Sequence, residues 1–292
     1  LKSLQGDPEN QDIEIVVVDN ASDAKTISSL RELENQSNLK IIYKDRNLGF
    51  SAGNNLGIGQ TASKIIILLN SDTLVPAGTI RKIAKLILDN PDFGAVGPVS
   101  NSVGNEQAIW VSNNKTESIL AEGKCWQKHA RDSTIKTSQL SFFCVGFRRE
   151  VWDAVGDLDE RYGKGYFEDV DYCLRIKKMG WKLIIAEGIF VYHQGSASFG
   201  RRPRKQRRLI RSNKRKLQQK HGTNVELIHL REANLQVLEK YLIEKRESAS
   251  KNLSYLFENR LMLAKQQMPK GLIKRWSYQR RLSRIVNDWK ST

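Results

Sequence analysis

The stretch "IEIVVVDN" (residues 13–20) is a run of β-branched residues that ends in an acid and an amide. A continuous apolar run of this kind is typical of a strand that is buried on both faces of a sheet. Three further runs resemble it, namely "LKIIY" (39–43), "KIIILL" (64–69) and "FGAVGPV" (93–99). The first third of the chain is therefore predicted to form the strands of one sheet.

The segments between these strands have the spacing of helices. Residues 76–90 begin with a proline and place apolar residues on one face, and residues 26–33 show a weaker pattern of the same kind. Residues 47–57, "NLGFSAGNNLG", are predicted as a Gly/Asn turn that runs into a short helix. Alternating strands and helices predict an α/β fold with a doubly wound, mainly parallel sheet.

The middle of the chain is less regular. Residues 101–140 are polar and weakly patterned, so we predict a loop-rich excursion over a cleft. Residues 141–155 are predicted as a strand followed by a helix, and residues 170–180 as a helix that ends at a glycine. Two short strands are expected between residues 181 and 193.

The net charge of +16 lies entirely in the last third of the chain. Residues 201–292 contain 25 Lys and Arg against 7 Asp and Glu, whereas residues 1–200 contain 23 against 25. We therefore predict a domain of residues 1–200 and a basic extension of residues 201–292. Apolar spacing predicts amphipathic helices at residues 225–245 and 251–268 of that extension.

The three cysteines show no CxxC spacing, and an odd number cannot pair fully within one chain. Cys144 and Cys173 stand among apolar residues and are predicted to be buried thiols, which favours a reducing cytosol. No apolar run approaches the roughly 18–20 residues of a membrane span, and no signal-peptide pattern is present.

Polar residues stand where two of the predicted strands end. Asp19 and Asn20 follow the first strand, and Asn70, Ser71 and Asp72 follow the third. Because ligands bind beyond the carboxyl ends of parallel strands, we expect Asp19 and Asp72 to converge around a divalent cation and the hydroxyls of a ribose. The alternative is that these residues merely cap the helices that follow.

The stretch "YFEDVDYCLR" (166–175) places three acids among aromatic and aliphatic residues. Asp169 stands at a predicted helix start, where backbone N–H groups and the helix dipole favour an ionised carboxylate that can act as a general base. Glu168 is expected to bind a hydroxyl, and Asp171 to stabilise the first helical turn. The alternative is an acid-rich helix start without a catalytic role.

Two further segments offer groups to a ligand. The turn at 47–57 lacks the GxxxxGK[ST] pattern of a phosphate loop, but its glycines allow close backbone approach and its asparagines offer amides. His193 follows a predicted strand and opens "HQGSASF", which we interpret as a polar loop that contacts a metal or a diphosphate. A lone histidine is, however, more often a structural residue.

The ordered set "IVVVDNASD", "NLGFSAGNNLGI", "LLNSDT", "GYFEDVDYCLR" and "HQGSASF" resembles the inverting family-2 glycosyltransferases, and among them bacterial rhamnosyltransferase-type enzymes of cell-surface polysaccharide synthesis. The resemblance covers roughly residues 1–200. It implies a GT-A fold, a UDP- or dTDP-sugar donor, Mg²⁺ or Mn²⁺ as cofactor, and transfer with inversion to a hydroxyl of a glycan or lipid-linked acceptor.

The resemblance also implies roles on the donor side of the site. Asp19, with Asn20 beside it, matches the acid that contacts the donor nucleoside. Asn47, Gly53 and Asn54 match the loop on the nucleotide side. The first strand of the family should precede Leu1, so the chain is expected to be an N-terminally truncated fragment.

The same resemblance implies which residues bind the metal and which take part in proton transfer. Asn70 and Asp72 stand at the metal-binding D-x-D position, with Asp72 as the retained acid, and His193 matches a histidine that helps to hold the metal. Asp169 matches the catalytic base and Glu168 the acid beside it on the acceptor side. The absence of a Q-x-x-R-W motif argues against a processive polysaccharide synthase.

The basic extension is expected to bind the anionic inner face of the plasma membrane, which suits a cytoplasmic, peripheral enzyme with a lipid-linked acceptor. Nucleic acid is not expected as a partner, because aromatic residues are not interleaved with the basic run at 201–216. The extension can also be a solvated surface. Two other functions stay open: a truncated, non-catalytic α/β domain whose basic tail binds membrane or nucleic acid, and nucleotidyl transfer.

Overall fold

The computed structural model describes residues 1–195, 203–223, 225, 228–247 and 253–292. Contacts within the chain divide it into two compact units. The first contains Leu1–Gly97, Lys136–Ile184 and Ser196–Val225, and the second contains Pro98–Ile135, Ile185–Gly195 and Glu226–Thr292. Because both units draw on sequence from each side of residue 200, the division into residues 1–200 and 201–292 stays a prediction.

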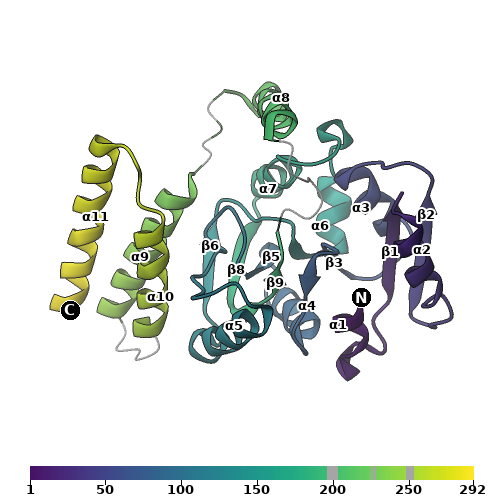
Figure 1. Cartoon of the computed structure of the whole chain (residues 1–292), viewed down its shortest axis with the longest axis horizontal. Helices are drawn as coiled ribbons and strands as arrows, with labels where there is room; N and C mark the ends of the chain where they lie inside the picture. The colour runs from purple at the N-terminus through teal and green to yellow at the C-terminus, as the bar shows by residue number, and fades with distance from the viewer. Residues whose placement is uncertain (196–202, 224, 226–227, 248–252) are drawn as a thin grey trace. The chain divides into compact units, whose positions relative to one another are not determined.

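The first unit begins with two short helical turns, α1 (Lys2–Gln5) and η1 (Pro8–Asn10), and a parallel strand pair. Strand β1 (Ile15–Asn20) places Ile15 opposite Leu39 and Asn20 opposite Lys44 of β2 (Leu39–Lys44). Helix α2 (Ala24–Arg31) connects the two strands (Figure 1). The predicted β-branched strand at the start of the chain is thus confirmed.

The larger sheet has the strand order β3-β7-β5-β8-β6. These strands are β3 (Ile65–Leu69), β5 (Phe93–Val99), β6 (Thr134–Thr137), β7 (Cys144–Arg148) and β8 (Lys182–Phe190). Strand β7 is antiparallel to both of its neighbours, so β3 and β5 run in the same direction on either side of it. The predicted α/β class with a mainly parallel sheet and a helical C-terminal part is confirmed.

One expectation about this sheet is not met. Strand β1 pairs with β2 in a sheet of its own, whereas β3 pairs with β7 in the larger sheet. The ends of β1 and β3 are therefore not neighbouring ends within one hydrogen-bonded sheet. The physical reason is that β7, which follows far along the chain, hydrogen-bonds to β3 from Leu69 to Ile65.

Helix α4 (Thr79–Asp89) packs on this sheet. Its buried face includes Ile83 and Ile87, and a Cβ atom at Gly146 of β7 would lie only 2.6 Å from Ile83 and 2.8 Å from Ile87. The helix begins three residues later than predicted because Gly78, in the left-handed region with φ of 73°, precedes it. Helices α3 (Phe50–Ile58), α6 (Arg149–Val155) and α7 (Glu168–Lys178) complete the predicted set, with the 3₁₀ turn η2 (Glu160–Tyr162).

The loop-rich excursion predicted for residues 101–140 is wrong. This segment contains α5 (Thr116–Ala130) and then β6. The buried residues of the helix are Ile119, Gly123, Trp126 and Ala130, which recur every three or four positions. The polar residues between them mask this period in the sequence. The two short strands predicted after residue 181 are instead one long strand, β8, followed by β9 (Tyr192–His193).

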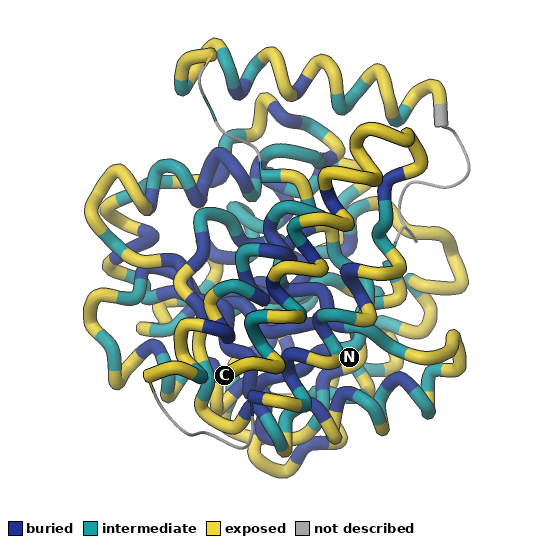
Figure 2. The backbone as a smooth tube through the Cα atoms, turned by 90° about the vertical axis from the view of Figure 1, so that its left-hand side faces the viewer, coloured by how far each residue is buried: buried dark blue, intermediate teal, exposed yellow. Residues whose placement is uncertain are grey.

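In the second unit, α9 (Leu230–Glu247), α10 (Leu253–Gln266) and α11 (Leu272–Ser291) pack on one another. Buried and exposed residues alternate along α9 and α10, whereas the first turns of α11 are exposed up to Tyr278. Figure 2 shows burial along the whole backbone. The fully buried Arg260 forms an ion pair with the fully buried Glu187 at 3.2 Å. The hydroxyl of Tyr241 donates to the same carboxylate. The two predicted amphipathic helices are therefore present, with α11 in addition.

Cys144 and Cys173 are buried thiols, as predicted, and neither forms a disulfide among the described residues. Burial raises the pKa of the Cys144 thiol to about 12, so it stays protonated. Among the described residues, no helix combines the length and the apolar character that a membrane crossing requires.

Candidate functional site

The start of α7 is held in an unusual backbone conformation. Tyr166 and Phe167, which immediately precede Glu168, both have positive φ angles, 72° and 76°. Residues other than glycine rarely adopt this region, and each instance costs roughly 1–3 kcal/mol. Such strain persists where the surrounding structure imposes it and is concentrated at functional sites. The backbone thus marks the predicted acid pair as a candidate site.

Glu168 and Asp169 lie in an environment that disfavours charge. Glu168 is only 8% exposed, and its Oε2 atom has no hydrogen-bond partner among the described residues. Burial, with the nearby charge of Asp169, raises the pKa of Glu168 to about 8. Burial also raises the pKa of Asp169 to about 6, although the N–H of Val170 donates to its Oδ1 at 2.8 Å and opposes the rise.

The expected helix-start effect therefore exists but is outweighed by burial. At neutral pH the pair shares one negative charge, with Asp169 ionised and Glu168 protonated. An ionised, poorly solvated carboxylate whose pKa lies near the working pH is suited to accept a proton from a hydroxyl. A protonated neighbour can donate a hydrogen bond to another oxygen of the same substrate.

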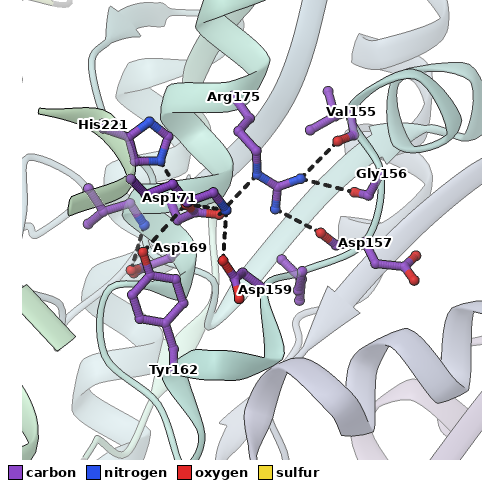
Figure 3. A network of polar contacts seen from close by, with 12 residues as sticks. Val155, Gly156, Asp157, Asp159, Tyr162, Asp169, Asp171, Arg175 and His221 are labelled. Atoms are coloured by element: carbon purple, nitrogen blue, oxygen red, sulfur yellow. Dashed lines mark hydrogen bonds and ion pairs between the residues drawn. The ribbon is translucent and has the colours of Figure 1, made fainter. Parts of the chain in front are cut away.

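Asp171, on the same helical turn, has the opposite environment. It is fully buried, yet its carboxylate accepts hydrogen bonds from Arg175 Nε at 2.9 Å, from Lys220 Nζ at 2.9 Å and from His221 Nε2 at 2.7 Å (Figure 3). The hydroxyl of Tyr162 donates to it at 3.4 Å. Asp171 is thus a structural anchor, as its place in the first helical turn predicts.

Helix α8 (Pro203–His221) of the first unit supports the loop that leads into the acid pair. The buried Nδ2 of Asn213 lies within hydrogen-bond distance of three carbonyl oxygens, those of Tyr162 at 2.8 Å, Gly165 at 2.9 Å and Tyr166 at 3.1 Å. The sequence was interpreted only as a basic run here. The available signal was Asn213 with Leu217, two non-basic residues spaced four apart within that run.

At the end of β1, Asp19 is 3% exposed and its Oδ1 atom has no hydrogen-bond partner among the described residues. Neither Asp19 nor Asn20 caps α2, because the N-cap is Asp23, whose carboxylate accepts from the N–H of Thr26 at 2.8 Å. The capping alternative for this strand end is therefore wrong. A buried acceptor without a partner at a strand end suits contact with a ligand hydroxyl.

Asn20 connects β1 to the Gly/Asn turn. Its Oδ1 accepts from the N–H of Leu48 at 2.6 Å, and its Nδ2 donates to the carbonyl of Gly49 at 3.0 Å. A Cβ at Gly53 would lie 3.5 Å from the same Nδ2 atom, so the helix α3 approaches β1 closely here. Asn20 thus fixes the position of the Gly/Asn turn relative to the end of β1.

The two other asparagines of the turn also make local contacts. Asn47 Oδ1 accepts from the N–H of Gly49 at 2.9 Å, and Asn54 Nδ2 donates to the carbonyl of Phe50 at 2.8 Å. The turn in addition contacts the loop before α7, since the N–H of Phe50 donates to the carbonyl of Gly163 at 3.3 Å. Continuous contacts therefore lead from Asp19 through the turn towards the acid pair.

The end of β3 is fixed beside β7. The N–H of Asn70 donates to the carbonyl of Phe143 at 2.8 Å, and the hydroxyl of Thr73 donates to the carbonyl of Asn70 at 2.7 Å. The next element is the short strand β4 (Thr73–Leu74), and α4 is preceded by Gly78. Asn70, Ser71 and Asp72 consequently cap no helix, so the capping alternative is wrong here too.

This strand end is connected to α7 through β7. The residue that precedes Phe143, Phe142, packs its ring edge-on against Tyr172 of α7 with ring centroids 5.9 Å apart. Segments bearing Asp19, Asp72 and Asp169 all belong to the first unit and reach α7 by short chains of contacts.

His193 belongs to the second unit. Asn101 holds its backbone on both sides, accepting from its N–H at 3.0 Å and donating to its carbonyl at 3.0 Å. The ring Nδ1 lies 2.7 Å from the carbonyl of Ser102 and therefore donates to it, which places the lone pair of the neutral ring on Nε2. This is the arrangement of a metal-binding histidine. Residues 196–199 of the predicted polar loop lie outside the described residues.

The described residues contain no group of three or more His, Cys, Asp or Glu side chains that could hold a metal ion. A dedicated protein cage for a cation is therefore absent from this part of the chain. Asp72 alone nevertheless fits Mg²⁺ or Mn²⁺, because these ions often take one or two carboxylates and complete their shell with substrate phosphates. The residues fit a cation that binds together with a diphosphate.

An open hollow of about 570 Å³ lies at the end of β2 and against α3, a size typical of ligand sites. Its wall contains two cations, Lys44 and Arg46, and two acids, Asp45 and Glu160, together with Leu48 of the turn. The sequence analysis did not single out these two cations. Their position directly after a parallel strand was the signal that could have indicated them.

Acidic and amide side chains stand at the ends of β1 and β3, and an acid pair stands at the strained start of α7 on the same α/β fold. The family model "Glycosyltransferase like family 2" matches residues 3–216. The chain belongs to this family, so the predicted family is confirmed.

Curated relatives are consistent with this assignment. An uncharacterized protein of Sinorhizobium fredii is 24% identical over 219 residues, which cover 68% of this chain but only 23% of that relative. The N-acetylglucosaminyl-diphospho-decaprenol L-rhamnosyltransferase of Mycobacterium tuberculosis is 24% identical over 218 residues, which cover 65% of this chain and 69% of that enzyme.

A solved structure confirms the GT-A fold. The mannosyltransferase PcManGT from Pyrobaculum calidifontis, in complex with GDP-Man and Mn²⁺, superposes with a TM-score of 0.55 at 17% identity. The superposition covers 98% of this chain and 80% of that enzyme.

Proposed function

We propose that the protein is an inverting glycosyltransferase that moves a sugar from a nucleoside-diphosphate donor to a hydroxyl of a glycan or lipid-linked acceptor. The observation that carries the proposal is the acid pair at the start of α7, in which Glu168 is buried and Asp169 half-buried, with one ionised member at neutral pH and no ion pair among the described residues. Burying such a pair without a cation costs stability, and a catalytic role explains why it is retained.

In the proposed reaction, Asp169 takes the proton of the acceptor hydroxyl as its oxygen bonds to the anomeric carbon. The bond between that carbon and the diphosphate oxygen breaks, and the nucleoside diphosphate leaves from the opposite face. Glu168 orients the acceptor, and Asp19 with Asn20 and the Gly/Asn turn holds the nucleoside. A cation held by Asp72 would stabilise the charge of the leaving diphosphate.

The named rhamnosyl relative supports a deoxyhexose donor and a diphospholipid acceptor, as in bacterial cell-surface polysaccharide synthesis. We therefore propose a dTDP- or UDP-sugar donor, with rhamnose as the first sugar to test. The lipid-linked acceptor in turn suits an enzyme that lies against the cytoplasmic face of the membrane.

The basic face of α8 supports this membrane contact. Its outward stripe consists of Arg204, Arg207, Arg208, Arg211 and Arg215, which recur every three or four residues and line an open hollow. Asn213, Leu217 and Lys220 lie about half a turn away and face the first unit. The guanidinium groups are suited to bind lipid phosphates, each contributing roughly 1 kcal/mol near the surface.

The test is a thermal-shift screen of UDP-, dTDP- and GDP-sugars with and without Mn²⁺, followed by an assay for release of the nucleoside diphosphate. The correct donor should raise the melting temperature by several degrees only with the metal. Asp72→Asn should abolish the metal dependence, whereas Asp89→Asn, at an exposed ion pair, should leave it intact. Absence of any donor binding, together with tight salt-sensitive RNA binding, would show a non-catalytic domain instead.

A further inference from the structure

Helix α11 has two different faces in the second unit. Tyr278, Leu282 and Ile285 are buried, and the hydroxyl of Tyr278 donates to the carbonyl of Ala264 at 3.1 Å. These residues recur every three or four positions and form the docked face of the helix. The ring of Trp289 also stacks on Phe257 with centroids 3.9 Å apart, so the helix is held by its middle and its C-terminal part, away from its N-terminal turn.

The N-terminal turn of α11 carries large apolar side chains on the face turned away from the docked one. Leu272 is 86% exposed, Ile273 85% and Trp276 63%, the highest values among the large apolar residues that the structure describes. At roughly 100° per residue, Leu272 and Trp276 lie one above the other and about a third of a turn from the middle of the docked face. We call these three residues the apolar triad.

Positive charge surrounds the apolar triad. Lys270, Lys274 and Arg275 flank it in the sequence, and the guanidinium of Arg280 lies 5.5 Å from the centroid of the Trp276 ring. The segment from residue 270 to residue 290 contains seven Lys and Arg and a single acid, Asp288. A partner that covers the triad must therefore tolerate or attract a dense positive charge.

We propose that the apolar triad inserts into the surface of an anionic phospholipid bilayer. Trp is enriched at the membrane interface, where its ring sits among the headgroups, and Leu and Ile gain from burial in the acyl region. Lys and Arg around the triad meet the anionic headgroups. A second copy of this chain does not suit the same face, because it would bring the same positive charge against it.

The proposal deepens the membrane contact of the proposed function and rests on it. It assigns different roles to the two basic helices, each considered within its own unit. The outward stripe of α8 consists of arginines and contributes attraction alone, whereas α11 adds apolar side chains that enter the bilayer. Insertion resists salt, and purely electrostatic attraction does not.

The test is co-sedimentation of the full chain with vesicles of phosphatidylcholine, alone or mixed with phosphatidylglycerol. The wild-type protein should bind the anionic vesicles and retain part of this binding at high salt. Replacing the triad by Leu272→Ser, Ile273→Ser and Trp276→Ser should weaken binding roughly hundredfold and remove the salt-resistant part. The fluorescence of Trp276 is obtained as the difference between the spectra of the wild type and of Trp276→Phe. This emission should shift to shorter wavelength when the wild-type protein binds the vesicles.

The matched control replaces three other exposed apolar residues, Leu88→Ser, Met179→Ser and Ile243→Ser, and should change binding less than about twofold. Equal binding of the triad variant and the wild type would overturn insertion and leave attraction by α8 standing. Absence of wild-type binding to anionic vesicles would overturn the membrane contact as a whole, without bearing on sugar transfer. A wild-type dimer that the triad variant converts to a monomer would also overturn the proposal.

Discussion

Asp169 and Asp171 are two residues apart on the first turn of α7, yet their carboxylates have opposite surroundings. Asp171 is buried among Arg175, Lys220 and His221, which offset its charge. Glu168 is buried and Asp169 half-buried, and neither has an ion pair among the described residues, so desolvation raises the pKa of both acids. The same helix start therefore holds one acid for stability and two at a cost in stability.

This difference separates Asp171, which stabilises the fold, from Glu168 and Asp169, which we propose take part in the reaction. A network selected only for stability would leave no buried carboxyl oxygen without a partner, as Glu168 Oε2 is among the described residues. The cations of α8 are directed at Asp171 instead, and Asn213 of the same helix holds the strained loop. The contacts of Asp171 and Asn213 thus stabilise α7 and the loop before it, whereas the acid pair at the start of the same helix lowers stability.

The largest effect is expected for Asp169→Asn. Loss of the general base should lower the rate of sugar transfer by about 10³-fold, with the KM for the donor little changed. The folded state should be at least as stable as the wild type, because a half-buried, unpaired charge is removed. Transfer kinetics and urea unfolding measure the two quantities. Asp153→Asn on the exposed face of α6 is the control and should behave as the wild type.

Retention of most activity by Asp169→Asn would reverse the comparison and make both acids structural. A joint loss of activity and of stability would have the same consequence, since a base that also holds the fold does not fit the unpaired environment.

The second effect concerns Asp171→Asn. Removing this charge leaves Arg175 and Lys220 facing a neutral amide in a partly buried network, which should lower the free energy of unfolding by about 3 kcal/mol. Urea unfolding at neutral pH measures the change. Asp89→Asn, which breaks the exposed pair with Lys85, should cost less than about 0.5 kcal/mol. Equal costs for the two variants would show that the Asp171 network contributes no more than a surface pair.

The third effect concerns Asn213→Ala. Three carbonyls of the strained loop lose their donor, so we expect a loss of about 2 kcal/mol in stability. The looser loop should also lower kcat about tenfold, because Glu168 and Asp169 lose their fixed position. Lys214→Ala, at the exposed neighbouring position, is the control. Loss of stability without loss of kcat would separate the loop from the site.

The sequence predicted most strands, most helices and the acid motif because each rests on local pattern. The β-branched run before Asp19 and the glycine-rich turn are recognised from adjacent residues. Helix α5 was missed because its buried positions, such as Gly123, are small or isolated among polar residues. The pairing of β3 with β7 was missed because it joins segments about 80 residues apart along the chain.

The residue types of the candidate site could be predicted from the sequence, but the contacts that hold those residues in place could not. Asp169 and Glu168 stand out in the sequence because aromatic residues flank them. Among the described residues no ion pair forms at Glu168 or Asp169, whereas Lys220 of α8 pairs with Asp171. Which acid is paired depends on where α8 packs, and the sequence does not show this. A basic run is typical of a solvent-facing helix. The sequence alone does not indicate that Asn213, on the opposite face of the same helix, is buried.

The last effect is a dependence of stability on pH that reports Glu168. Its pKa is raised in the folded state, so its protonated form is favoured there, and its contribution to stability is fully present below its unfolded pKa of about 4.5. That contribution is lost as the pH rises through about 8. Glu168→Gln, which stays neutral, should therefore gain stability over the wild type as the pH rises from 5 to 8, by about 1.4 kcal/mol for each pH unit.

Urea unfolding at several pH values measures this gain, and Glu150→Gln on the exposed start of α6 is the control that should show none. The gain should also shrink in Asp169→Asn, because the charge of Asp169 is one of the two causes of the raised pKa of Glu168. A gain that is independent of pH would mean that Glu168 is ionised in the folded protein. The acid pair would then carry two charges, and Asp169 would no longer be the one member able to take a proton at neutral pH.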